Sequence, residues 1–290
     1  MNKLILIHLS IFIISCSSYD KDEYNNDQSF YEENKFEDHE LFYMANNYIE
    51  SGQLDLALIE LDKIEVLFPS SSYAKKSILV TAYIHFLKKN YEKTRALAET
   101  FKNYYPGSED IIYASYLEAM TYFVMMKKSD YTQDNSIIAL EKFNFILNAY
   151  PNNKYEVDIL TRLKVINDNL AENKLKIAKF YLENKNYNGS LLYLKDIFIN
   201  QSTSNSVEET LYLLTKVYFT IDEYELAKKY ASILAYNFPT SEWYKKSYNL
   251  LNGFDNIESD NKWYKKYNPI KIFQSDLENN SNNTIIQPIE

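Results

Sequence analysis

Residues 41–69, LFYMANNYIESGQLDLALIELDKIEVLFP, contain two apolar runs at helical spacing, with Gly52 between them and Pro69 at the end. Ala45 in the first run and Ala57 in the second stand where two helices would cross, and a methyl group there permits a close approach. Gly52 suits a left-handed turn between the helices, and Pro69 cannot continue the second helix. The stretch therefore predicts a helix–turn–helix unit of about 34 residues that ends at the proline.

The aromatic–proline ending of this unit recurs along the chain. The first three occurrences are about one unit apart, and the last lies about two units further on, so one unit has lost its proline. Small or polar residues suited to helix caps follow each proline. The endings are Phe68-Pro69, Tyr105-Pro106, Tyr150-Pro151 and Phe238-Pro239. The pattern resembles the tetratricopeptide repeat, and it predicts an all-α, right-handed superhelical solenoid of about five repeats.

The expected domain organisation follows from this repeat frame. The third repeat requires an insertion at its inter-helix turn, around residues 127–135. Residues 154–174 read as continuous helix that lengthens the first helix of the fourth repeat. Residues 253–290 turn to Asn, Asp and Ser and are expected to be a polar, largely disordered tail. Within a solenoid of residues 38–252, the repeats span about 38–71, 75–108, 112–153, 171–204 and 208–241, followed by a capping helix.

The N-terminus has the features of a lipoprotein signal peptide, residues 1–15, with basic Lys3 before an apolar run too short to span a bilayer. The sequence Ile13-Ile14-Ser15-Cys16 resembles the bacterial lipobox, in which the cysteine is acylated and becomes the first residue of the mature chain. Alternatives are an ordinary signal peptide with a chance cysteine, or a cysteine in the core of the mature chain. Residues 16–37 would then be the lipidated cysteine and a flexible tether.

Composition and motifs argue against several functions. The net charge of −9 disfavours nucleic acid as a partner, which requires a basic face. The glycines are isolated, so no phosphate-binding loop is present in the sequence. His39 and His85 lack metal-ligand spacing, and His85 falls at the large aromatic position of repeat two, as a packing residue would. We therefore expect no catalytic residue, no metal ligand, no cofactor and no enzymatic activity.

A solenoid of this kind presents a concave groove lined by the first helix of each repeat, and such a groove suits an extended segment of a partner. Polar and aromatic residues on these helices are the candidate partner-binding residues. The alternative is that they are structural or simply exposed. The candidates on these helices are Tyr43, Asn47, Tyr83, Tyr116 and Tyr212, and Tyr193 on the second helix of repeat four is a further partner-binding candidate.

Taken together, the lipobox, tether, five repeats and insertion resemble the BamD family, lipoproteins of the outer-membrane β-barrel assembly machine. The resemblance covers about 38–245 and is most specific in residues 129–187. The matching positions there are Tyr150, Pro151, Asn152, Tyr155, Arg162, Leu163, Leu170, Ala171, Ala178 and Tyr181.

The resemblance implies a non-catalytic, lipid-anchored scaffold on the periplasmic face of the outer membrane. Its implied partners are a BamA-like barrel-assembly subunit at the C-terminal repeats, other assembly lipoproteins, and unfolded outer-membrane protein segments at the N-terminal repeats. Gly189, Ser190 and Tyr193 stand where the family commonly has Ala-Ala and then Arg, which leaves the detailed interface open. The alternative is another envelope adaptor of the division or Tol–Pal type, although those proteins usually carry a coiled coil and no lipid cysteine.

Overall fold

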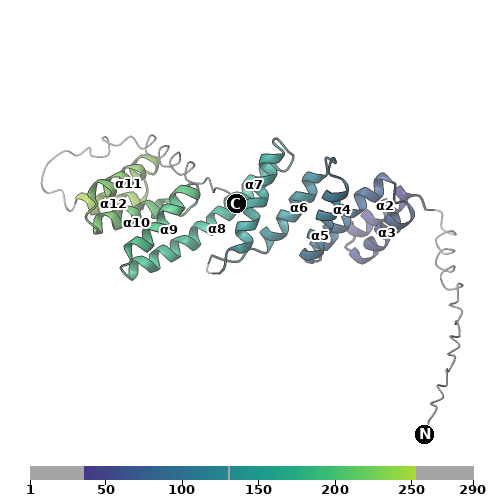
Figure 1. Ribbon diagram of the computed structural model, residues 1–290, viewed down its shortest axis with the longest axis horizontal. Coiled ribbons are helices and arrows are strands. Elements are labelled where there is room, and N and C mark those ends of the chain that lie inside the picture. Colours follow the sequence, from purple (N-terminus) through teal and green to yellow (C-terminus); the bar gives the residue numbers. More distant parts are fainter. Residues whose placement is uncertain (1–35, 130, 253–290) are drawn as a thin grey trace, which may run out of the picture. The chain divides into compact units, whose positions relative to one another are not determined.

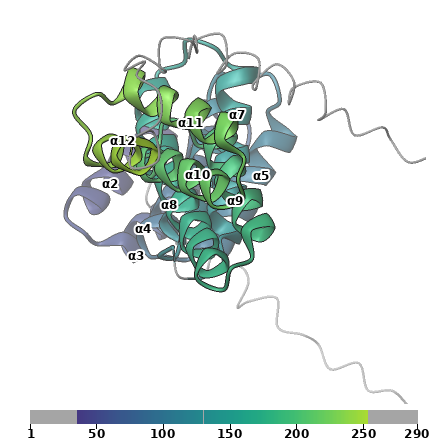
Figure 2. The same ribbon diagram turned by 90° about the vertical axis from the view of Figure 1, so that its left-hand side faces the viewer.

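The computed structural model describes residues 36–129 and 131–252, and all regular structure in these residues is α-helical (Figures 1 and 2). This confirms the all-α helical-repeat fold class. The expected signal peptide, Cys16, the tether up to residue 35 and the tail 253–290 lie outside the described residues. The helices are α2 (Asp38–Glu50), α3 (Leu54–Leu67), α4 (Ser72–Leu87), α5 (Tyr91–Tyr104), α6 (Ile111–Val124), α7 (Asp134–Ala149), α8 (Glu156–Glu183), α9 (Tyr187–Asn200), α10 (Val207–Thr220), α11 (Tyr224–Asn237) and α12 (Glu242–Asn252).

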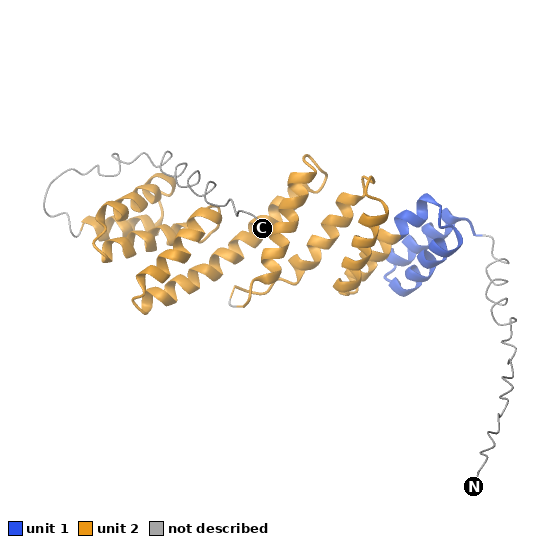
Figure 3. Cartoon of the chain, viewed as in Figure 1, with its two compact units in different colours: residues 1–77 blue, residues 78–290 orange. Residues whose placement is uncertain are grey.

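The chain divides into two compact units, residues 1–77 and residues 78–290 (Figure 3). In the first unit, α2 and α3 pack as a helical hairpin. Ala45 and Ala57 are completely buried in it, as their small size at the helix crossing predicts. Gly52 connects the helices with a φ of +76°, a left-handed conformation that costs glycine little.

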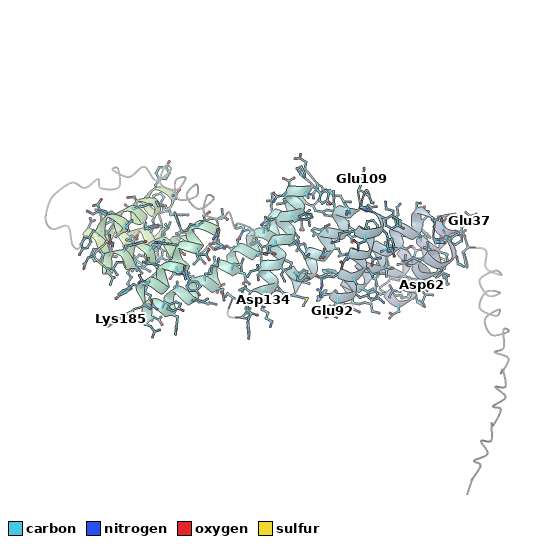
Figure 4. The ribbon with its side chains drawn as sticks, viewed as in Figure 1. Glu37, Asp62, Glu92, Glu109, Asp134 and Lys185 are labelled. Atoms are coloured by element: carbon cyan, nitrogen blue, oxygen red, sulfur yellow. The ribbon has the colours of Figure 1, made fainter. Side chains whose placement is uncertain are left out.

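The second unit repeats the same hairpin. Helices α6 and α7, α8 and α9, and α10 and α11 pack in pairs, and α12 packs on α10. Figure 4 shows Glu92, Asp134 and Lys185, at the turns within repeats, along one edge of this unit, and Glu109, at a turn between repeats, on the opposite edge. The described part of the chain contains no helix that is long and apolar enough to cross a membrane.

Helix α8 joins two apolar cores of the second unit because it is 28 residues long. Ile159 and Ile166 in its N-terminal half pack in a core with Phe143 of α7. Ala178, further along the helix, packs in a second core with Leu194 of α9. One continuous helix therefore connects the third hairpin with the fourth.

The segment between α6 and α7 is fixed to α8 by side chains on one face of that helix. Asn169 Nδ2 donates to the Lys127 carbonyl at 2.9 Å, and Asn173 Nδ2 donates to the Ser129 carbonyl. Lys176 Nζ donates to the Ser129 hydroxyl at 2.7 Å. These three residues are spaced by four and three positions, so they lie above one another on the helix. The connecting segment thereby braces the middle of α8.

Gly189 on α9 is required by a close ring contact. A Cβ atom at this position would lie 2.8 Å from Cδ1 and 2.9 Å from Cγ of Tyr181. The Tyr181 ring in turn stacks on Tyr193, with centroids 5.8 Å apart and planes inclined by 16°. Gly189 and Tyr193 are therefore parts of one packing arrangement around Tyr181.

Replacing Gly189 by alanine should lower the free energy of unfolding by about 1 kcal/mol. Overpacking against Tyr181 costs roughly 1–3 kcal/mol, and the better helix propensity of alanine offsets up to about 1 kcal/mol of that cost. Urea denaturation measures the difference. Gly107→Ala is the matched control, because no atom lies within 4 Å of a Cβ there. A Gly189→Ala variant as stable as the parent would contradict the close contact.

Candidate functional site

Tyr83 and Tyr116 come together on the first helices of the second and third repeats, in a group that we call the tyrosine cluster: Tyr83, Tyr113, Tyr116 and Tyr155. The Tyr116 ring stacks on Tyr155 with centroids 4.6 Å apart and planes inclined by 14°. Tyr113 stacks on the same ring at 6.0 Å. Tyr83 lies close enough to Tyr113 for the two phenols to interact electrostatically. The Tyr83 side chain is exposed. Three rings from α6 and the start of α8 therefore stack, and Tyr83 of α4 lies close to one of them, Tyr113.

An ion pair fixes the orientation of this cluster. The Tyr116 hydroxyl donates to Asp158 Oδ2 at 2.5 Å. Arg162 donates to both oxygens of the same carboxylate, from Nε at 2.6 Å and from Nη2 at 3.0 Å. Such a two-point pairing is geometrically specific. The guanidinium also lies over the Phe123 ring, 4.9 Å from its centroid, so Asp158 is held in place from two helices.

The protonation states in this network follow from its contacts. Burial opposes ionisation of Asp158, but the hydrogen bonds from Arg162 and Tyr116 outweigh it and lower the carboxyl pKa. Burial and the hydrogen bond to Asp158 raise the pKa of Tyr116 to about 12. The phenol therefore stays protonated and donates, while the carboxylate stays charged. The network therefore holds these aromatic rings in a fixed orientation near neutral pH.

The other sequence candidates lie elsewhere. Tyr43 and Asn47 are exposed and one turn apart on α2, in the first unit. Tyr193 is partly buried and stacks on Tyr181. Tyr212 packs against Trp243 of α12, with ring centroids 5.3 Å apart. In the second unit, two of the four candidates, Tyr83 and Tyr116, therefore belong to the tyrosine cluster, and Tyr193 and Tyr212 lie in separate aromatic contacts.

Two members of the cluster were not among the sequence candidates. Tyr113 precedes Tyr116 by three positions on α6, and this spacing places both rings on one helix face. Tyr155 precedes α8, and in the sequence it is only one of the positions that match the family pattern. The helical spacing was therefore available as a signal for Tyr113, whereas the stacking on Tyr155 depends on how α8 packs against α6.

A cleft of about 630 Å³ lies on another side of α6, between α5 and α7. Glu118 lines it and accepts from Lys102 Nζ at 2.5 Å and from Lys142 Nζ at 2.6 Å. Burial disfavours the ionised form of Glu118, but the hydrogen bonds from Lys102 and Lys142 outweigh this effect, so the pKa of the carboxyl is lowered. This triad links the three helices that form the cleft.

Replacing Glu118 by glutamine should lower the free energy of unfolding by about 1–3 kcal/mol at neutral pH, because two charge-assisted hydrogen bonds are lost. The pKa of this carboxyl is depressed in the folded state, so its stabilisation is present above the ordinary pKa of 4.5 and is lost as the pH falls through the folded value. Urea denaturation at pH 7 and pH 3 measures both effects. Glu141→Gln, an exposed residue lining the same cleft, is the control and should change stability little. Equal losses at both pH values would contradict the ionic role.

The remaining titratable groups suggest no further site. His85 is buried, and its Nδ1 atom has no hydrogen-bond partner. Burial and the nearby charges of Lys93 and Lys88 lower its pKa, so the ring is neutral at pH 7. In the part of the chain that the structure describes, no group of three His, Cys, Asp or Glu residues is placed to hold a metal ion.

Comparison with known proteins gives one consistent family. The family model described as "YfiO: Outer membrane lipoprotein" matches residues 34–234. The outer membrane protein assembly factor BamD of Rickettsia prowazekii is 31% identical over 197 residues, covering 68% of this chain and 78% of that protein. The BamD of Caulobacter vibrioides is 30% identical over 214 residues, covering 73% and 70%. The BamD of Pasteurella multocida is 27% identical over 208 residues, covering 68% and 80%. The resemblance seen in the sequence is confirmed, and the chain belongs to the YfiO/BamD family of outer membrane lipoproteins.

Proposed function

We propose that the protein is a non-catalytic, lipid-anchored scaffold subunit of the machinery that assembles β-barrel proteins in the outer membrane. The observation that carries the proposal is the family match across residues 34–234, which includes the first nine described helices, α2 to α10, and most of α11. The relatives are named assembly factors rather than enzymes, which supports a non-catalytic role. In this proposal Cys16 carries the lipid, and residues 36–252 lie on the periplasmic side of the membrane.

The tyrosine cluster supports a role in holding extended polypeptide segments. Tyrosine offers a large, rigid contact area at low entropic cost, and its hydroxyl can bond to a passing backbone. An extended segment places alternate side chains on one face, roughly 6.8 Å apart. The rings of the cluster are spaced by 4.6–6.0 Å, which is comparable. Apolar side chains of an unfolded outer-membrane protein are therefore the ligands that we propose for this surface.

Removing one exposed ring of the cluster should weaken this binding. Tyr83→Ala is expected to raise the Kd of a fluorescent peptide from an unfolded outer-membrane protein about 5- to 30-fold, the equivalent of 1–2 kcal/mol. Fluorescence anisotropy gives the Kd. Tyr104→Ala is the matched control, because Tyr104 is 74% exposed on α5 and is not a member of the cluster. Equal effects of the two variants would count against the cluster as the binding surface.

The partner of the C-terminal repeats is proposed to be the periplasmic part of the barrel-forming subunit. A pull-down of residues 17–290 by these domains from the same organism tests the assignment. Lys195→Glu in the fourth repeat and Lys216→Glu in the fifth, both exposed, should weaken the capture. Lys93→Glu in the second repeat makes the same charge change and should leave it intact. No capture by the barrel-forming subunit, together with recovery of division proteins, would overturn the proposal.

A further inference from the structure

Helix α3 of the first unit has apolar residues on two sides. Its buried side, which includes Ala57, Leu61 and Ile64, is completely covered. A second set of aliphatic residues is exposed, and at 3.6 residues per turn these fall in one sector of about 100° beside the buried side. We call this set the α3 stripe: Leu56 (41% exposed), Ile59 (51%), Val66 (68%) and Leu67 (43%).

The α3 stripe carries no net charge. Lys63 lies within it, but its Nζ is 3.0 Å from both carboxylate oxygens of Glu60, and its side chain is only 22% exposed. The acidic residues Asp55, Asp62 and Glu65 fall in the third sector, in which Asp55 borders the stripe and Glu65 borders the buried side. The helix therefore presents a neutral aliphatic side and an acidic side to its surroundings.

The position of the stripe in the chain suggests what covers it. About 20 residues separate Cys16 from Phe36, where the described structure begins. A chain of 20 residues spans at most about 70 Å when fully extended. Once Cys16 is anchored, the first unit is thus the described part nearest to the lipid along the chain. A tether of at most this length raises the effective concentration of membrane at the stripe.

We propose that the α3 stripe docks on the lipid surface of the membrane that holds the anchor, an inference that rests on the lipid anchor of the proposed function. Protein-binding hot spots are rich in Trp, Tyr and Arg, and the stripe has none of these. Aliphatic side chains on one side of a helix and charged ones on another are what an interfacial helix needs. Because its charged side is acidic, the helix favours zwitterionic over anionic lipid, unlike the usual basic interfacial helices.

An environment-sensitive label tests the docking in the lipidated full-length protein. Ile59→Cys places a nitrobenzoxadiazole dye on the stripe, and Glu65→Cys places it on the acidic side of the same helix. Cys16, the only native cysteine, is consumed by the lipid. On phosphatidylcholine vesicles, the dye at position 59 should shift to shorter wavelength and be quenched several-fold by spin-labelled lipid. The dye at position 65 should behave as in water. Phosphatidylglycerol in the vesicles should reduce the shift.

The outcomes separate the docking from the anchor. Protein that floats with the vesicles while both dyes remain accessible to aqueous iodide would overturn the docking and leave the anchor standing. If the emission of the dye at position 59 shifts but is not quenched by spin-labelled lipid, the stripe contacts protein, such as a second copy of the chain, rather than lipid. That outcome would also overturn the lipid docking. Protein that does not float contradicts the anchor and the docking together. The double variant Leu56→Ser/Val66→Ser should abolish the shift while preserving flotation and helical circular dichroism.

Discussion

Replacing Cys16 by alanine is expected to move the protein from almost entirely membrane-bound to almost entirely soluble. Acyl chains contribute about 0.8 kcal/mol per buried methylene group, and one chain alone gives only marginal attachment. In the proposed lipoprotein, the several acyl chains on Cys16 would give stable anchoring, so losing the cysteine would remove the main source of membrane affinity. Vesicle or cell-fraction flotation measures the change, and mass spectrometry of the N-terminal peptide reports the lipid directly.

Ser18→Ala, close to the same cleavage site, is the control and should remain membrane-bound. A Cys16→Ala protein that stays with the membrane after an alkaline wash would contradict lipid anchoring at this residue. The α3 stripe does not change this expectation. Its four exposed side chains act only on a protein already held near the lipid, so they cannot replace the anchor once the effective concentration is lost.

The ends of the second helices were predictable from the sequence alone. Helices α3, α5, α7 and α11 each end two residues before the proline of an aromatic–proline pair. The reason is local, because proline cannot continue a helix and also restricts the residue before it. Helix α9 ends at Asn200 without a proline, two residues before Ser202, where the repeat frame places the missing one. Packing within the repeat therefore determines where the second helix ends, even where no proline follows it.

The role of individual tyrosines was less predictable. Tyr116 and Tyr212 have similar places in their repeats, yet Tyr116 joins a surface cluster and Tyr212 packs against Trp243 of α12. Helical spacing places a residue on a face, but the helix that packs beside it decides whether that face is covered. Tyr193 illustrates the same limit, because its stacking on Tyr181 depends on the absence of a side chain at Gly189.

The bracing of α8 by Asn169, Asn173 and Lys176 was also missed. The sequence marks the insertion between α6 and α7 by its length and polarity, since it interrupts the repeat frame. Its contacts are with residues more than forty positions away, and two of the three use backbone carbonyls as acceptors. Any polar residue on that face of α8 could have been solvent-exposed instead, so spacing alone does not identify the partners.

The largest loss of stability should come from Phe143→Ala, which is expected to lower the free energy of unfolding of the second unit by about 3–5 kcal/mol. Phe143 is completely buried in the core formed by α6, α7 and the first half of α8. Its ring lies 6.2 Å from those of both Tyr116 and Phe123. Truncation removes apolar contacts and leaves a cavity that rigid helix packing cannot fill completely.

The matched control lies two positions further along the same helix. Phe145 is 58% exposed, so Phe145→Ala should cost less than about 1 kcal/mol although it deletes the same atoms. Urea denaturation followed by circular dichroism and by tyrosine fluorescence measures both variants. Because Phe143 supports the ring of Tyr116, its removal should also weaken peptide binding in the fraction that remains folded, whereas Phe145→Ala should not. Similar losses of stability in the two variants would contradict the placement of Phe143 in the core. An unchanged Kd for Phe143→Ala would show that peptide binding by the tyrosine cluster does not depend on the Phe143 side chain.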